Sequence, residues 1–369
     1  HWREVLRLVA GRAVSGQVDG EDVAFVRNQM VNEVLQSRND VNGVADEHIL
    51  AVVFGSHPYA RPPGGDQQSV SALTRDDVEN YYAGHWHPNN AILILAGDVD
   101  PSEVFEVAAR AFEPWQRGEV VGGASVPVPE MEENQVRAVN LVEQQGFEIR
   151  IGLGAAPLTP EDDLAMQALN FILGGGRDGS RLATALRARW GAEQPVSTVW
   201  SSGREGGFLL LSTRSSDEGL RAVIDACLAV ITQLQQEGPT AGELETAKQY
   251  LTGAQLFGFQ TSGAISDRWL NVEVFDRGDD YLEQYPVMVA ALTSEDIMRV
   301  AGQIMRTEPL AFVTVGTRVH IRGQLSPFGL PQHVSVYGRT GAIPAIEVPL
   351  PGPSVEASPE AREQALALV

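Results

Sequence analysis

The stretch ALTRDDV at residues 72–78 recurs as ALTSEDI at residues 291–297, so the two copies are offset by 219 positions. Each copy is followed by a helix-like run and then by an apolar segment that ends in glycine, Leu93–Gly97 in the first copy and Val313–Gly316 in the second. The spacing from leucine to glycine is 24 in both (97 − 73 and 316 − 292). Because repetition at a fixed offset indicates duplicated structure, the sequence predicts two related units, each with a helix followed by a buried strand.

Both copies carry the signals of a helix start. Thr74 and Thr293 can accept hydrogen bonds from the first free backbone amides, and the acidic residues after them lie near the positive end of the helix. The second unit begins its first strand-like pattern near Gln135, so its counterpart would begin at position −84 (135 − 219). We therefore expect the first unit to be N-terminally truncated.

Alternating and helical patterns predict an α/β (α+β) fold of two homologous lobes, each a mixed β-sheet with flanking helices. Strands are expected at Ile149–Leu153 and Phe208–Leu211. The predicted domains are the first unit (1–116), a Gly/Pro-rich linker (117–133), the second unit (134–330) and a Pro-rich, Ala/Glu-rich tail (331–369). Helices are predicted over Glu21–Arg38, Arg75–Gly84, Ser102–Phe112, Leu164–Leu173, Ser180–Arg189, Ser216–Gln236 and Thr240–Gln255.

Composition excludes some classes of function. The net charge of −21 argues against nucleic acid as the main partner, because phosphate binding needs clustered Lys and Arg. No run of about 18 apolar residues occurs, so no membrane span is predicted. The single cysteine, Cys227, lies in an amphipathic run and is predicted to be a core residue.

An ordered series of short motifs runs through residues 5–330, and no single piece is specific. Its members are His85–Asn90 before the segment ending Gly97-Asp98, Leu173–Gly176 with Ser180–Leu182, Glu243-Leu244 with Ala247-Lys248, Phe259–Thr261 and Asp280-Tyr281. In this order the series resembles the insulinase/pitrilysin family of zinc metallopeptidases, the inverzincins that include processing peptidases. The resemblance implies paired α/β lobes around a peptide-holding chamber.

The resemblance also implies a zinc site that this sequence does not complete. Active members use His-x-x-Glu-His, in which both histidines bind zinc and the glutamate activates water. The 369 residues contain no such motif, and at the start Val5 stands where its second His would be. Glu33 matches the family's third zinc ligand, while Val26 replaces a second family glutamate seven positions earlier. An alternative for Glu33 is an ordinary surface position on an amphipathic helix.

Two further residues correspond to a substrate-binding pair. Arg187 matches a family arginine that works with a tyrosine seven positions later, and both can donate to a developing oxyanion. Here Gln194 occupies the tyrosine position, so the pair is half preserved. Arg187 could equally be a helix-surface cation. His48, His57, His85 and His87 lack an evident third metal partner and are interpreted as structural.

Three functions stay open. The first is a zinc peptidase that encloses and cleaves peptides, inactive as the chain stands. The second is a non-catalytic chamber subunit that pairs with a catalytic homologue, and the third is a scaffold of the kind that relatives form in respiratory complexes. Expected partners are a peptide and a homologous subunit, in a homo- or heterodimer. By analogy alone we expect a bacterial protein of the periplasm, ahead of the cytoplasm.

Overall fold

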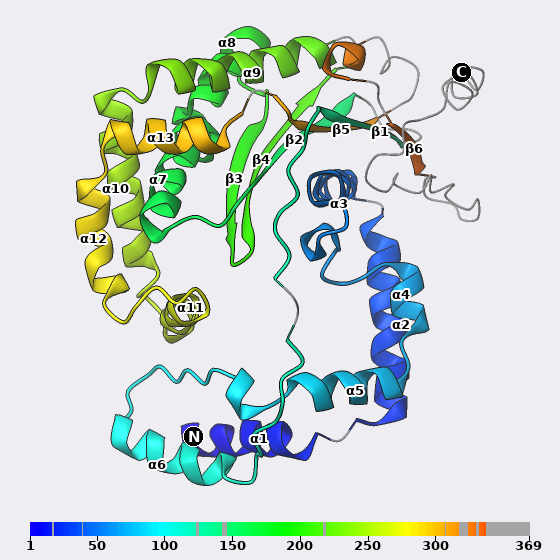
Figure 1. Ribbon diagram of the computed structural model, residues 1–369, viewed down its shortest axis with the longest axis vertical. Coiled ribbons are helices and arrows are strands. Elements are labelled where there is room, and N and C mark those ends of the chain that lie inside the picture. Colours follow the sequence, from blue (N-terminus) through cyan, green and yellow to red (C-terminus); the bar gives the residue numbers. More distant parts are fainter. Residues whose placement is uncertain are drawn as a thin grey trace.

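The fold is taken from a computed structural model, which describes residues 1–16, 18–38, 40–122, 125–141, 146–216, 219–306, 308–316, 324–329 and 332–336 (Figure 1). One mixed sheet with helices on both faces dominates the second unit. This arrangement confirms the predicted α/β class.

Six strands form that sheet in the order β3-β4-β2-β5-β1-β6. β2 is antiparallel to β4 and to β5, whereas β1 is parallel to β5 and to β6. Apolar and charged residues alternate along β2, from Phe147 to Ile151. Because successive side chains of a strand point to opposite sides, one face of β2 is apolar and the other is charged. The strands are β1 (Gln135–Leu141), β2 (Phe147–Ala155), β3 (Val196–Gly203), β4 (Gly206–Ser215), β5 (Ala311–Gly316) and β6 (Gln332–Val336).

One face of the sheet carries the main core. Phe147, Ile149 and Ile151 of β2 are buried in a cluster with helices of the second unit. The amphipathic run around Cys227 forms α9, which buries Leu220, Ile224 and Leu234 on one face. Cys227 is fully buried on the same face, as the sequence predicted. The helices of this unit are α7 (Pro160–Asn170), α8 (Arg181–Trp190), α9 (Leu220–Glu237), α10 (Ala241–Phe257), α11 (Ser262–Val274), α12 (Tyr281–Ala291) and α13 (Ser294–Ile304).

A helix of the first unit covers the opposite face. α3 packs its buried Val44, Ile49 and Val53 against Val313 and Val315 of β5 and their neighbours. Figure 1 places α3 beside the sheet, whereas α1, α5 and α6 lie at the far end of the molecule. The helices of the first unit are α1 (Trp2–Ser15), α2 (Gly20–Ser37), α3 (Val41–Phe54), α4 (Gln67–Ala72), α5 (Arg75–His85) and α6 (Pro101–Phe112).

The repeat recurs in the positions of the helices. Adding 219 to the bounds of α5 gives 294–304, the bounds of α13. The same shift carries α1 to 221–234, α2 to 239–256 and α3 to 260–273, which overlap α9, α10 and α11. Thr74 and Thr293 cap their helices in matching capping boxes with Asp77 and Asp296. The duplicated helix therefore forms twice, as the sequence predicted.

The strand predicted at Leu93–Gly97, in the first copy of the repeat, does not form. Residues 91–96 form no ladder, and the described residues before Gln135 contain no strand. Its counterpart β5 lies between β2 and β1 and pairs with both, whereas a segment becomes a strand only where at least one partner strand lies beside it. No such partners lie beside it in the described ranges, and Ile92 and Leu93 are each 49% exposed.

The sequence also missed five helices and two strands. Neither β3 nor the helices α1, α3, α4, α11 and α12 were predicted, and β6 falls inside the range predicted as a tail. β6 extends the sheet by pairing with β1 from Arg137 to Leu141. The rest of that predicted tail, from residue 337, lies outside the described residues. Within the described ranges, no helix has the length and apolarity that crossing a bilayer requires.

Candidate functional site

Glu33 lies on the open face of α2. The helix starts at the capping carboxylate of Asp19 and runs to Ser37, so Glu33 is one turn before its end. Gln29 Nε2 donates to Glu33 Oε1 at 2.9 Å. A shallow hollow of about 420 Å³ follows this face, lined by Phe25, Asn28, Gln29, Asn32, Glu33 and Gln36. Glu33 is thus accessible and surrounded by amides, while Val26, at the position of the second family glutamate, is 50% exposed.

The same face is buried in the duplicate helix. The counterparts of Asn28 and Asn32 at an offset of 219 are Ala247 and Leu251 of α10, which are 0% and 5% exposed. Their packing belongs to the core of the second unit. Amides in the first copy therefore stand where the second copy has core side chains.

Arg187 and Gln194 are held by local partners. Arg187 pairs with Asp178 at 2.7 Å, and its Nε has no hydrogen-bond partner in the described structure. Gln194 Nε2 donates to the carbonyl of Arg214 at 2.6 Å and to Thr213 Oγ1 at 3.2 Å. Among the described residues, no hydrogen bond joins Arg187, Gln194 and Glu33 to one another. Their roles in binding stay predictions.

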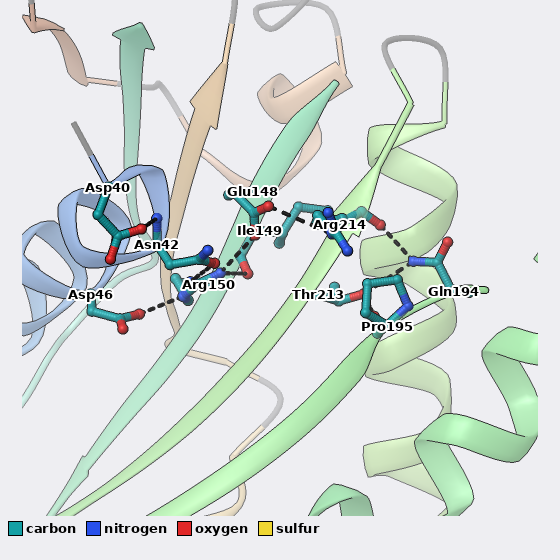
Figure 2. A network of polar contacts seen from close by, with 10 residues as sticks. All are labelled: Asp40, Asn42, Asp46, Glu148, Ile149, Arg150, Gln194, Pro195, Thr213 and Arg214. Carbon is teal, nitrogen blue, oxygen red and sulfur yellow. Dashed lines mark hydrogen bonds and ion pairs between the residues drawn. The ribbon is translucent and has the colours of Figure 1, made fainter. Parts of the chain in front are cut away.

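Gln194 instead borders a network that crosses the sheet face toward α3 (Figure 2). Glu148 lies 3.6 Å from Arg214 and 3.3 Å from Arg150. Arg150 is 3% exposed, and its guanidinium also contacts Asp46 at 2.5 Å and Asn42 at 2.9 Å, both on α3. Buried charges require such compensation, because desolvation of an unpaired ion costs several kcal/mol. The network holds α3 on the sheet beside the predicted substrate side.

A second polar contact lies further along α3. Arg137 NH1 of β1 lies 3.1 Å from His48 Nδ1. Burial, together with the neighbouring Arg137 cation, lowers the pKa of His48 to about 4. The ring is therefore neutral near pH 7 and accepts from the guanidinium. His57 is also structural, since its buried ring caps Tyr59 N and contacts Val126 O of the linker.

Sequence reasoning missed Arg137, Glu148 and Arg150. Their signal was present in the alternation of strand residues, because the charged side chains of β2 occupy the positions between Phe147, Ile149 and Ile151. A charged second face on a central strand indicates that something polar must cover it. The strand alone could not show that α3 is the element that packs on this charged face.

The uncovered part of this face lies at β3. β3 is an outer strand of the sheet in the described residues. Ser197 and Ser201 are exposed, and Val199 between them is 51% exposed. An outer strand presents unpaired backbone amides and carbonyls that can bind an extended chain. This edge and the Glu33 face are both accessible to a peptide.

Comparisons with known proteins agree with this architecture. The family profile described as "Peptidase M16 inactive domain" matches residues 72–251. An uncharacterized zinc protease of Streptomyces coelicolor is 25% identical over 298 residues, which cover 79% of this chain and 64% of that protein. The crystal structure of a peptidase M16 inactive domain from Pseudomonas fluorescens matches with a TM-score of 0.74 at 21% identity, covering 85% of this chain and 75% of that one.

In its sequence profile and its fold, this chain resembles the insulinase/pitrilysin family. It spans just under two thirds of the length of the Streptomyces relative. A chain of complex III from Candida albicans also shares the fold, with a TM-score of 0.72 at 16% identity over 85% of this chain and 76% of that one.

The names of several relatives include zinc, but the described residues of this chain do not form a zinc site by themselves. They contain no group of three His, Cys, Asp or Glu side chains placed to hold a metal. A catalytic zinc needs three protein ligands and an open position. Glu33 could supply one ligand, so any zinc site that uses it needs donors from outside the described residues.

Proposed function

We propose that this chain is the peptide-binding part of a zinc peptidase of the insulinase/pitrilysin family. In this proposal β3 and the sheet face near Gln194 bind an extended peptide. Glu33 contributes one ligand to a metal site whose histidines come from another segment or subunit. The chain by itself does not hydrolyse peptides, because its sequence has no His-x-x-Glu-His.

The observation that carries the proposal is the polar face of α2. Asn28, Asn32 and Glu33 are exposed on this face and line the same hollow. The duplicate helix has the buried Ala247 and Leu251 in place of the two asparagines. The exposed polar side chains leave Glu33 hydrated and open to a ligand.

Peptide binding follows from the outer strand. An extended peptide can add a strand to an open sheet edge through main-chain hydrogen bonds, with side chains read by the exposed face. Val199 offers an apolar contact, and the guanidinium of Arg214, which is 61% exposed, offers a cation for an acidic side chain or a carboxyl terminus. We expect unfolded or extended peptides to bind in preference to folded proteins.

The test is peptide binding by fluorescence anisotropy with proline variants of β3. Of two neighbouring strand residues, one donates its amide to β4 and the other presents it to the edge. Ser201→Pro and Ser202→Pro are both at exposed positions, so one should abolish binding while leaving the circular dichroism spectrum intact. Unchanged affinity in both variants would rule out pairing at β3.

A second candidate is a non-catalytic chamber subunit, favoured by Val26 and Gln194 at positions where active members carry Glu and Tyr. The complex III relative belongs to a multi-subunit assembly, which supports a homologous partner. The peptidase and the chamber subunit can be distinguished by co-purifying this chain with a homologue that contains His-x-x-Glu-His and measuring the zinc content. Metal lost in Glu33→Gln, but kept in the matched Glu21→Gln on the same helix, supports the peptidase. Equal metal in both supports the chamber subunit.

A further inference from the structure

α3 belongs to the first unit by sequence but packs as part of the second. Its buried residues Val44, Ile49 and Val53 share a core with Phe208 of β4 and Val315 of β5. Only residues 38–40 separate its start from the end of α2. The position of α2, and of Glu33 one turn from its end, is therefore linked to a helix that is fixed on the other unit.

A closed loop of contacts strengthens this link. After α3 the chain turns at Pro58–Ala60 and leads to α4, which packs against α2. Arg27 of α2 donates to the carbonyl of Leu73, which follows α4, at 2.8 Å. The chain therefore leads from both ends of α3 to the packed pair α2 and α4, which links the position of this pair to that of α3.

Two glycines on β2 let α3 lie close to the sheet. A Cβ at Gly152 would lie 2.8 Å from Ile49 Cγ1 and 2.9 Å from Val53 Cγ2. At Gly154 it would lie 3.1 Å from Val53 Cγ1. Real Cβ atoms rarely approach so closely in a densely packed interior, so a side chain at Gly152 would push the helix outward.

The polar contacts fix the helix along its axis. Arg150, which is 3% exposed, donates hydrogen bonds to Asn42 and Asp46, which lie one turn apart on α3. Glu148 contacts the same guanidinium from the sheet. A planar guanidinium donates in fixed directions, so these hydrogen bonds set the position of α3 along its own axis relative to β2. Apolar packing alone does not fix that position.

We propose that α3 is a cross-unit anchor, and that Arg150 and Gly152 are positioning residues that set where Glu33 lies relative to the sheet face beside Gln194. The functional part of this statement rests on the proposed function, since it concerns the place of Glu33. The geometrical part concerns only the distance between α2 and the sheet. It can fail or hold whatever the peptide-binding experiments show.

The experiment measures distances between spin labels by pulsed electron paramagnetic resonance in the full chain. One pair joins Gln36→Cys on α2 to Gln249→Cys on α10, and a second pair within the second unit joins Ser201→Cys to Gln249→Cys. The native Cys227 is fully buried, so it does not compete for label. Arg150→Met and Gly152→Ala are the test variants. Arg150→Lys and Gly302→Ala, where no atom lies within 4 Å of the added Cβ, are the controls.

The anchor predicts that both test variants replace the single narrow distance from α2 to α10 with a broad or shifted one. Arg150→Lys should restore part of the narrow distribution, Gly302→Ala should leave it unchanged, and the pair within the second unit should stay narrow throughout. An unchanged distance from α2 in both test variants overturns the proposal. Equal broadening of both pairs also overturns it, because the residues would then act on the sheet itself.

Discussion

Arg150 of β2 and Asp46 of α3 are 104 residues apart in the sequence, yet Arg150 Nε donates to Asp46 Oδ1 at 2.5 Å. The arginine is buried and the aspartate is half exposed. The contact therefore joins the second unit to a helix of the first. It also places the boundary between packed bodies inside the first unit rather than at the linker, because α3 shares its core with the sheet.

Ile49→Ala should destabilise the second unit although Ile49 precedes it in the sequence. Ile49 is fully buried between α3 and the sheet, so its truncation leaves a cavity. We expect a loss of about 2–5 kcal/mol in the free energy of unfolding, measured by urea denaturation. Leu35→Ala on the exposed face of α2 is the matched control, with a change within about 0.5 kcal/mol. Equal effects of the two variants would contradict the packing of α3.

Glu243 should make the protein sensitive to acid. Its hydrogen bond to Arg181 is the main cause that lowers its pKa from 4.5 to about 2, with help from Thr240. The folded state then favours the carboxylate, so this stability is present above pH 4.5 and is lost as the pH falls from 4.5 toward 2.

Glu243→Gln should remove that part of the pH dependence and lower stability at pH 7 by about 1.5–3 kcal/mol, the range for a hydrogen bond to a charged group. Chemical denaturation at a series of pH values checks it. Glu245→Gln, exposed on the same helix, should change little. Parallel pH profiles for wild type and Glu243→Gln would be inconsistent with the pairing.

His48 should act in a different pH range. Its pKa is lowered to about 4, so below pH 6.5 the unfolded chain takes up the proton before the folded protein does. Stability that depends on the neutral ring, through its burial and then its contact with Arg137, is present above pH 6.5 and declines as the pH falls toward 4. His48→Gln keeps an acceptor for Arg137 but cannot be protonated, so its stability should decline less over this range. His85→Gln on α5 serves as the comparison, and it should retain the wild-type slope.

Cys227 should be unreactive in the native protein. Complete burial raises the pKa of its thiol to about 12, so almost no thiolate forms at pH 8. A maleimide reagent should label the chain only after unfolding, as followed by mass spectrometry. Rapid labelling without denaturant would show that α9 does not pack on the sheet as described.

The sequence predicted local features well because their causes are local. The helix caps at Thr74 and Thr293 depend on residues close in the sequence, and the buried face of the amphipathic run around Cys227 depends on helical periodicity. Both were confirmed. The repeat offset also carried over to the helices, since it is a property of the chain rather than of its packing.

The failures involve contacts between distant residues. The segment Leu93–Gly97 has the composition of a buried strand, but a strand also needs neighbours, and composition cannot show whether they are present. α3 was missed because its apolar residues serve a sheet whose nearest strand lies more than eighty positions later, at β1. The predicted roles of Glu33, Arg187 and Gln194 came from resemblance, and they stay predictions.

Hydrogen exchange of β3 with and without an extended peptide tests the central claim most directly. The claim predicts that peptide slows exchange at amides within Val196–Gly203 that face the sheet edge, while amides of α1 and α6 are unaffected. Protection confined to other elements, or none at saturating peptide, would contradict it.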